Sequence, residues 1–186
     1  MKLEDVRNKI DELDPELRKL LMDRLDCSYE VAKAKCESGD TNIYRADREE
    51  EILKKLSEGV PADRVSGYLA VVKKIMETSR MYQYGLLYEW LEDSDVTRGF
   101  SYKDTDTHVC VRVSRQDRPN AMSAILSMIG DYGYNMYRME FVEENKEEHT
   151  VTFELDIIGE LTSVNMKKLL FQLSKECLTF EILRSY

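Results

Sequence analysis

The sequence predicts an all-α N-terminal domain followed by an α+β C-terminal domain with the ferredoxin-like order βαββαβ. Two observations predict this division. In residues 1–90 the apolar side chains recur at steps of three and four, which places them on one face of a helix. After residue 107 short runs alternate between apolar and polar residues, and two runs with helical spacing lie among them. The length of 186 residues accommodates two small domains.

Three helices are expected in the N-terminal domain, residues 1–90. The first and third carry long stripes, whose members are Val6, Ile10, Leu13, Leu17, Leu20, Arg24, Cys27 and Val31, and then Val65, Leu69, Val72, Met76, Ser79, Gln83, Leu86 and Trp90. A shorter helix over residues 44–58 ends near Gly59 and Pro61. Pro15 removes a backbone donor from the first helix, so we expect a kink there. Because three helices do not bury two such stripes alone, we expect a homodimer that forms an intertwined bundle.

The second part of the chain begins with a predicted linker over residues 91–107, which are polar and lack a period. Residues 108–186 form the expected α+β domain. Its elements are a strand over 108–114, a helix around 122–129, strands over 134–143 and 149–158, a helix around 166–173 and a last strand over 178–183. This order predicts an antiparallel sheet with both helices on one face.

The composition narrows the classes of function. A net charge of −9 argues against nucleic acid or an anionic membrane as the main partner, since these bind basic surfaces. The 4 cysteines show no CxxC spacing, and neither a signal peptide nor a long apolar run is present, so we expect reduced thiols in a cytoplasmic protein. With only 2 histidines, a Ser-His or Cys-His enzyme is not favoured, and we expect neither a metal site nor a cofactor.

Polar residues interrupt the two apolar stripes. Arg24 lies in the first stripe, and Lys35 follows it by three helical turns on nearly the same face. Ser79 and Gln83 lie one turn apart in the third helix. Such positions disfavour polar groups unless a partner satisfies them. There are alternative explanations. Polar residues within an apolar stripe also fix helix register or oligomeric state, and a lysine at a helix end commonly reaches solvent.

Further charged residues flank the short break between the first two helices. Arg48 and Glu49 lie in the first turn of the second helix, where they could also be an exposed charged turn. Arg7 is ~100° from Arg24 around an ideal helix, so it would serve a partner chain rather than the same cavity. Taken together, these cations with one hydroxyl, one amide and one carboxylate predict a cavity for a small polyanion that bears hydroxyls.

The helical part resembles the all-helical chorismate mutases. The residues that carry the resemblance are "VRNKIDELD" from Val6, "LLMDR" from Leu20, "VAKAK" from Val31, "ADRE" from Ala46 and "ETSRMYQ" from Glu77. The polar positions keep their order and spacing across residues 1–90. The resemblance implies a homodimer with two equivalent sites for chorismate, in which Arg7 enters from the opposite chain.

The resemblance also implies a role for each polar residue. Arg7 and Arg24 would bind the two substrate carboxylates, with help from Ser79. Lys35 would bind one carboxylate and the ether oxygen, to which Gln83 would also donate. Rearrangement of chorismate to prephenate moves no proton, so the site would hold the compact diaxial substrate and stabilise charge that grows on the ether oxygen.

The second helix contributes two more residues by the same resemblance. Arg48 would orient the neighbouring catalytic groups, and Glu49 would accept the ring hydroxyl. Arg45 stands where a family member carries Asp, so Arg45 is left out of the expected site. The overall expectation is a chorismate mutase (an isomerase) of phenylalanine and tyrosine biosynthesis.

Residues 108–186 resemble an ACT domain, the regulatory module found at the end of many prephenate dehydratases. "DRPNAMSAIL" from Asp117 is similar to that family's strand-to-helix turn, and "EILRSY" also resembles that group. The resemblance implies an amino-acid effector site, with Asn120, Ala121, Met122 and Glu140 as candidates. Where dehydratases carry Glu-Ser-Arg-Pro, this chain has Glu-Phe-Val-Glu from Glu140, so the effector is not defined. Asn120 is also a common turn residue, and a purely structural role for the domain stays open.

A second class of function is a non-catalytic regulator that senses an amino acid and uses its helical half to dimerise or to dock on a partner enzyme. The series of polar residues on the helices favours catalysis, because a module that only dimerises has no use for it.

Overall fold

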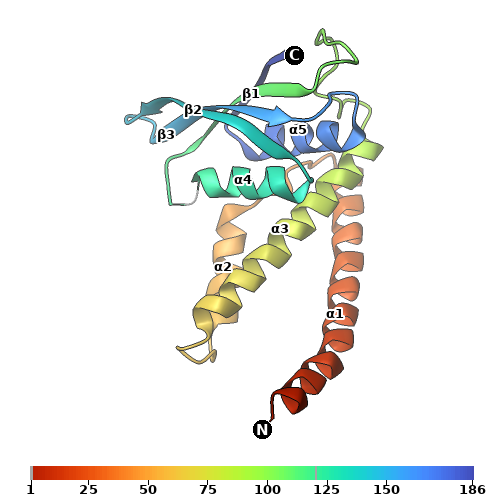
Figure 1. The fold of residues 1–186 in the computed structure, drawn as a ribbon, viewed down its shortest axis with the longest axis vertical. Coiled ribbons are helices and arrows are strands. Elements are labelled where there is room, and N and C mark those ends of the chain that lie inside the picture. Colours follow the sequence, from red (N-terminus) through yellow and green to blue (C-terminus); the bar gives the residue numbers. More distant parts are fainter. Residues whose placement is uncertain (1, 120) are drawn as a thin grey trace.

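A computed structural model describes residues 2–119 and 121–186 of the chain. Its elements are α1 (Leu3–Ser38), α2 (Ala46–Ser57), α3 (Val65–Trp90), β1 (His108–Gln116), α4 (Ala121–Asp131), β2 (Asn135–Asn145), β3 (Thr150–Ile158), α5 (Val164–Glu176) and β4 (Thr179–Ser185). Figure 1 shows the three N-terminal helices on one side of the molecule and the sheet with α4 and α5 on the other. The predicted fold class and order of elements are confirmed.

The longest element is α1, with 36 residues, which corresponds to about 54 Å of helix. The helix continues through Pro15, and Figure 1 shows its N-terminal turns leaning away from the axis of the rest. At the other end Gly39 adopts φ 74°, and its N–H donates to the carbonyl of Cys36 at 3.2 Å. Glycine takes this left-handed conformation without a steric penalty, so the helix ends there.

Helix α3 packs against α1 and α2. Ala32 of α1 is fully buried, because its small side chain allows α3 to approach closely. One helical turn earlier, Ser28 is also buried, and its hydroxyl donates to the carbonyl of Arg24 at 3.1 Å. Near the end of α3 the ring of Trp90 meets that of Tyr29 edge-on at 5.5 Å. The contact between α1 and α3 therefore covers the C-terminal half of α1.

The C-terminal domain is an antiparallel sheet of 4 strands in the order β2-β3-β1-β4. Alternate residues of β1 (Val109, Val111 and Val113) are fully buried against the helices. In β3, Leu155 and Ile157 contribute to the same core. The opposite face of the sheet carries charged side chains, so α4 and α5 cover a single face as the alternation predicts.

A second apolar cluster joins the two parts of the molecule. Phe171 of α5 is almost completely buried and meets the rings of Tyr84 and Tyr88 of α3, at centroid distances of 6.2 and 6.0 Å. The connecting segment 91–107 contributes Leu91 and Val96 to this cluster, and its Asp95 carboxylate pairs with Lys167 of α5 at 2.9 Å. The expected linker is therefore packed onto the C-terminal domain rather than extended away from it.

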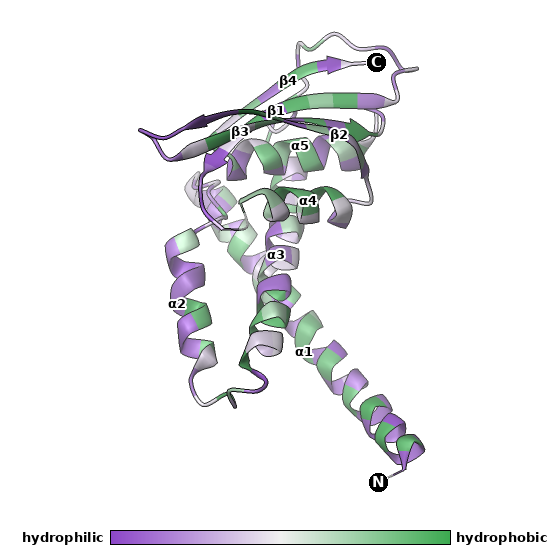
Figure 2. Cartoon of the chain, turned by 60° about the vertical axis from the view of Figure 1, so that its left-hand side comes forward, coloured by the Kyte–Doolittle hydropathy of each residue, from purple (hydrophilic) through white to green (hydrophobic). Residues whose placement is uncertain are grey.

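The N-terminal half of α1 keeps its apolar stripe exposed in the single chain. Leu20 is 65% exposed and Leu13 is 55% exposed. Figure 2 shows hydrophobic residues spread along this projecting part of α1. None of the described helices combines the length and the apolar character that crossing a membrane requires.

Candidate active site

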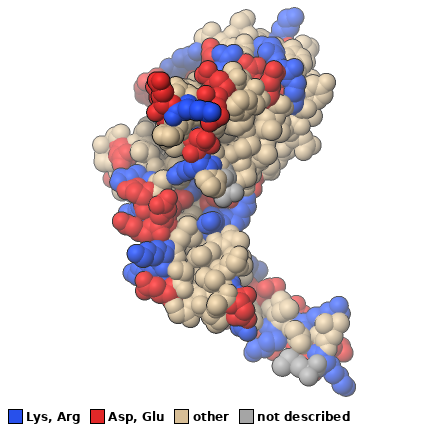
Figure 3. Space-filling model, turned by 90° about the vertical axis from the view of Figure 1, so that its left-hand side faces the viewer, with Lys and Arg blue, Asp and Glu red and all other residues tan. Residues whose placement is uncertain are grey.

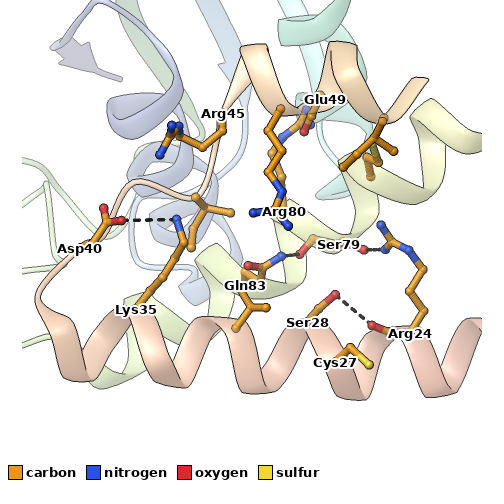
Figure 4. Close-up of a pocket in the computed structure, with 15 residues that line it drawn as sticks. Arg24, Cys27, Ser28, Lys35, Asp40, Arg45, Glu49, Ser79, Arg80 and Gln83 are labelled. Carbon is orange, nitrogen blue, oxygen red and sulfur yellow. Dashed lines mark hydrogen bonds and ion pairs between the residues drawn. The ribbon is translucent and has the colours of Figure 1, made fainter. Parts of the chain in front are cut away.

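A cavity of about 470 Å³ lies between α1, α2 and α3. Six of the seven residues that the sequence predicted for the substrate site line it: Arg24, Lys35, Arg48, Glu49, Ser79 and Gln83. Figure 4 shows side chains of α1 directed toward those of α3, with Glu49 on the opposite side. Residues separated by up to 59 positions in the chain thus surround one cavity because α1 and α3 run side by side.

Two cations come from α1. Arg24 donates through Nη1 to the hydroxyl of Ser79 on α3. Lys35, in the last turn of α1, donates to the carbonyl of Asn42 and lies 3.7 Å from the carboxylate of Asp40. The backbone N–H of Asn42 and the ammonium of Lys35 lower the pKa of Asp40 below its usual value. Groups of the protein therefore contact both cations.

The α3 wall supplies the neutral donors. Ser79 and Gln83 are both buried, and they lie on the same face because they are one turn apart. Gln83 donates through Nε2 to the carbonyl of Ser79 at 3.1 Å. Since an amide has two N–H groups, this bond leaves a second donor of Gln83 for a ligand.

The α2 wall supplies Arg48 and Glu49 from its first turn. Arg45, which precedes the helix and was left out of the predicted site, also lines the cavity, and its guanidinium lies 3.4 Å from Asp47. Basic side chains around the cavity therefore outnumber the acidic ones, which are Asp40 and Glu49. An excess of positive charge in a partly enclosed cavity favours a polyanionic ligand.

Arg80 is the site residue that the sequence reasoning missed. Its guanidinium pairs with Glu49, lies 3.1 Å from the carboxylate of Glu176 on α5, and stacks over the ring of Tyr44 at 4.8 Å. Burial lowers the pKa of Arg80, but Glu176 and Glu49 raise it more, so the net pKa is above its ordinary value. Its position in "ETSRMYQ", between Ser79 and Gln83, was the available signal.

Arg7 lies outside this cavity. It is exposed near the N-terminus of α1, and 17 residues of helix, about 25 Å, separate it from Arg24. Within one chain Arg7 therefore does not reach the other predicted site residues.

The three predicted effector residues that the structure describes do not form one cluster in the single chain. Ala121 and Met122 begin α4, under the covered face of the sheet. Glu140 pairs in register with Glu154 on the open face, where it contacts Arg138 at 2.7 Å. Asn120 lies outside the described residues.

The helical fold and the basic cavity fit an enzyme that binds a small polyanion between helices. The sequence profile of chorismate mutase type II matches residues 6–84, which contain every residue that lines the cavity. This match to the helical part of the chain supports an isomerase, a chorismate mutase. A comparison with curated proteins found no match.

Proposed function

We propose that this protein is a chorismate mutase that converts chorismate to prephenate and works as a cytoplasmic homodimer in phenylalanine and tyrosine biosynthesis. The observation that carries the assignment of residues is the cavity in which six predicted groups from three helices converge. A matching set of cations, hydroxyl, amide and carboxylate has no purpose in a bundle that only dimerises.

Binding of the two substrate carboxylates would be shared between the chains. Arg24 and Ser79 already form one polar group, and a carboxylate can accept from the remaining N–H groups of the guanidinium. The second carboxylate would be bound by the partner subunit's Arg7, with Lys35 close by. Holding both carboxylates in one geometry selects the compact conformer and removes much of the entropic barrier.

Charge that develops on the ether oxygen would be stabilised by Lys35 and Gln83. Lys35 is held by the loop after α1, and Gln83 is held by its own helix, so both donors are positioned before the substrate binds. Preorganised donors of this kind need no reorganisation as the C–O bond breaks. Glu49 would accept a hydrogen bond from the ring hydroxyl, while the ion pair with Arg80 holds that carboxylate in place.

The proposed homodimer rests on the exposed stripe of α1. Apolar residues such as Leu13 and Leu20 lie on the half of the helix that projects beyond α3. A second copy would cover this stripe and bring its own Arg7 toward the cavity. Sedimentation should therefore give twice the chain mass, and a monomer at micromolar concentration would contradict the proposal.

We also propose that the C-terminal domain is an ACT-like regulatory module. The observed strand order and the covering of one face by α4 and α5 support this reading. Its contact with α3 through Phe171 gives a route by which an effector can influence the helical domain.

The direct test is the loss of ultraviolet absorbance as purified protein consumes chorismate. We expect saturable turnover far above the uncatalysed rate. A well-folded dimer without turnover would refute the enzymatic assignment and favour the non-catalytic regulator.

A further inference from the structure

A largely buried ion network links the C-terminal domain to the wall of the active-site cavity. At its centre the guanidinium of Arg80, on α3, donates through Nη1 to Glu49 of α2 and through Nε to Glu176 of α5, the latter at 3.1 Å. The side chain of Glu176 is 1% exposed and that of Arg80 is 11% exposed, whereas Glu49 is 24% exposed and lines the cavity. One arginine therefore joins a carboxylate of the active site to a carboxylate of the other domain.

Glu176 is itself held on its far side by the C-terminal domain. Gln172, one helical turn earlier on α5, donates at 2.8 Å to the same oxygen of Glu176 that Arg80 contacts. Gln172 in turn accepts from the hydroxyl of Tyr132, directly after α4, at 3.0 Å. Both Gln172 and Glu176 are buried, so these bonds rather than water determine where the carboxylate lies. The network is thus anchored in the C-terminal domain.

The plane of the Arg80 guanidinium is fixed as well. It stacks over the ring of Tyr44, 4.8 Å from the centroid. The backbone N–H of Tyr44 donates to the hydroxyl of Tyr84 at 3.2 Å, and the hydroxyl of Tyr44 accepts from Arg118 at 2.6 Å. Since the N–H groups of an arginine form a rigid planar fork, the bond from Nε and the stacked ring together decide where Nη1 points. The contacts of Glu176 and Tyr44 therefore determine where this arginine delivers its second bond.

That second bond leaves Glu49 able to accept from a ligand. Arg80 binds Oε1 of Glu49. An ionised carboxylate has about four acceptor positions on its two oxygens, so Oε2 can accept a hydrogen bond from a hydroxyl in the cavity. A glutamate side chain has several rotatable bonds, and a free one must be ordered when a ligand binds. The ion pair orders Glu49 beforehand.

Other ion pairs between the two parts of the molecule do not reach the cavity. Lys74 of α3 lies 2.6 Å from Asp131 at the end of α4, and Lys168 of α5 lies 2.5 Å from Glu89 of α3. None of these four residues lines the active-site cavity. Figure 3 shows basic side chains close to acidic ones where the two parts of the molecule meet. The network of Arg80 differs from these pairs because it ends at the active site, and the pairs provide matched controls.

We propose that Glu176 and Arg80 are positioning residues of the active site, and that they act through Glu49 to set its preference for a substrate that carries a hydroxyl. The C-terminal domain thereby completes the active site of its own chain without contacting the substrate. This inference rests on the proposed mutase function, since it concerns the hydroxyl of the bound substrate. A purely structural role of the two residues would instead weaken every ligand of the cavity alike.

The test compares two inert ligands by titration calorimetry of the full-length protein. One is an oxabicyclic dicarboxylate with a hydroxyl, shaped like the compact reacting conformer of chorismate, and the other is its deoxy analogue. The unmodified protein should bind the hydroxyl-bearing ligand about tenfold more tightly, because the deoxy analogue lacks a hydrogen bond to a charged group. The KM and kcat for chorismate are the second readout.

Two variants should lose this preference for the hydroxyl. Glu176→Gln keeps the shape of the side chain and an acceptor oxygen, so it should stay folded. It should weaken the hydroxyl-bearing ligand at least about threefold and the deoxy analogue less than about twofold, because a charge-assisted bond to Arg80 becomes a neutral one. Arg80→Lys should cause a selective loss of about tenfold, since an ammonium does not reproduce the planar fork.

Kinetics and a control complete the experiment. Glu176→Gln should raise the KM for chorismate by about the factor that it costs the hydroxyl-bearing ligand, with little change in kcat, because the contact is present in ground state and transition state alike. Asp131→Asn removes the charge from an ion pair of the same kind away from the cavity, so it should change neither the two affinities nor the KM.

The ratio of the two dissociation constants decides the outcome. A ratio that is the same in Glu176→Gln, Arg80→Lys and the unmodified protein, with circular dichroism confirming each fold, would overturn the positioning role while turnover stands. Equal weakening of both ligands would also overturn it and would assign the network to stability alone. A folded protein that neither turns over chorismate nor binds either dicarboxylate would refute the proposed function, and the inference would fall with it.

Discussion

Replacement of Gln83 tests whether a neutral donor on α3 stabilises the charge that grows on the ether oxygen. Gln83 is 8% exposed, and one of its N–H groups is engaged by the carbonyl of Ser79 at 3.1 Å. The substitution Gln83→Ala removes the second donor from the cavity while the helix hydrogen bonds remain. Loss of one such preorganised donor lowers kcat by about 10²–10³.

The substitution Gln83→Glu gives a sharper test at nearly constant volume. At neutral pH the new carboxylate repels the oxygen that becomes negative, whereas the protonated acid has an O–H that can donate. Glutamate has an ordinary pKa of about 4.3, which burial raises. We therefore expect the activity of Gln83→Glu to rise as the pH falls below neutral, while the unmodified enzyme needs no acid conditions because its amide does not titrate.

Initial rates, measured from the loss of chorismate absorbance between about pH 5 and 8, give the activity of both Gln83 variants across the range in which a buried glutamate would titrate. Circular dichroism shows whether each variant is folded. Retention of more than about a tenth of kcat in Gln83→Ala would contradict the role of the donor. So would a collapse of the unmodified enzyme's rate between mildly acid and neutral pH.

Three further predictions concern Lys35, the Arg80–Glu176 ion pair and the Asp95–Lys167 ion pair. Lys35→Ala should abolish most turnover while sedimentation still reports a dimer, and unchanged turnover would refute its role. Glu176→Ala removes a 1% exposed partner of Arg80, which should lower stability by about 3 kcal/mol and Tm by about 6–12 °C, whereas Glu176→Gln keeps an acceptor and should lose less. Burial raises the pKa of Asp95, but bonds from Thr97 and Lys167 lower it more, so the net pKa lies below the ordinary 3.8. The ion pair therefore stabilises the fold above that pH, and this stabilisation is lost as the pH falls below it. The free energy of unfolding of Asp95→Asn, measured by chemical denaturation, should fall less on acidification than that of the unmodified protein, by up to about 1 kcal/mol. Equal acid dependence in the two proteins would count against the pair.

The order of elements could be predicted because it depends on local pattern. Steps of three and four marked the helices, and alternation marked strands such as 108–114, since side-chain direction follows the period of each structure. The same reasoning placed Arg24, Lys35, Ser79 and Gln83 on the apolar faces of the first and third helices, where polar groups need partners. Their convergence in one cavity is what the structure adds.

Arg80 could not be found in this way. It is next to Ser79 in sequence and so is about 100° away from it around the helix, off the seam. Its role depends on Glu49, 31 residues earlier, and on Glu176, 96 residues later. Packing of α5 against α3 brings these carboxylates to one guanidinium, and no local period encodes such a contact.

By itself, then, the sequence determined the type and order of the helices and strands and the residues on their inward faces, because these follow from backbone geometry and hydrophobic spacing. Only the tertiary structure decided how the two domains meet. The burial of Phe171 against α3 and the Glu49–Arg80–Glu176 network both arise from side chains that are far apart in the chain and meet only through packing.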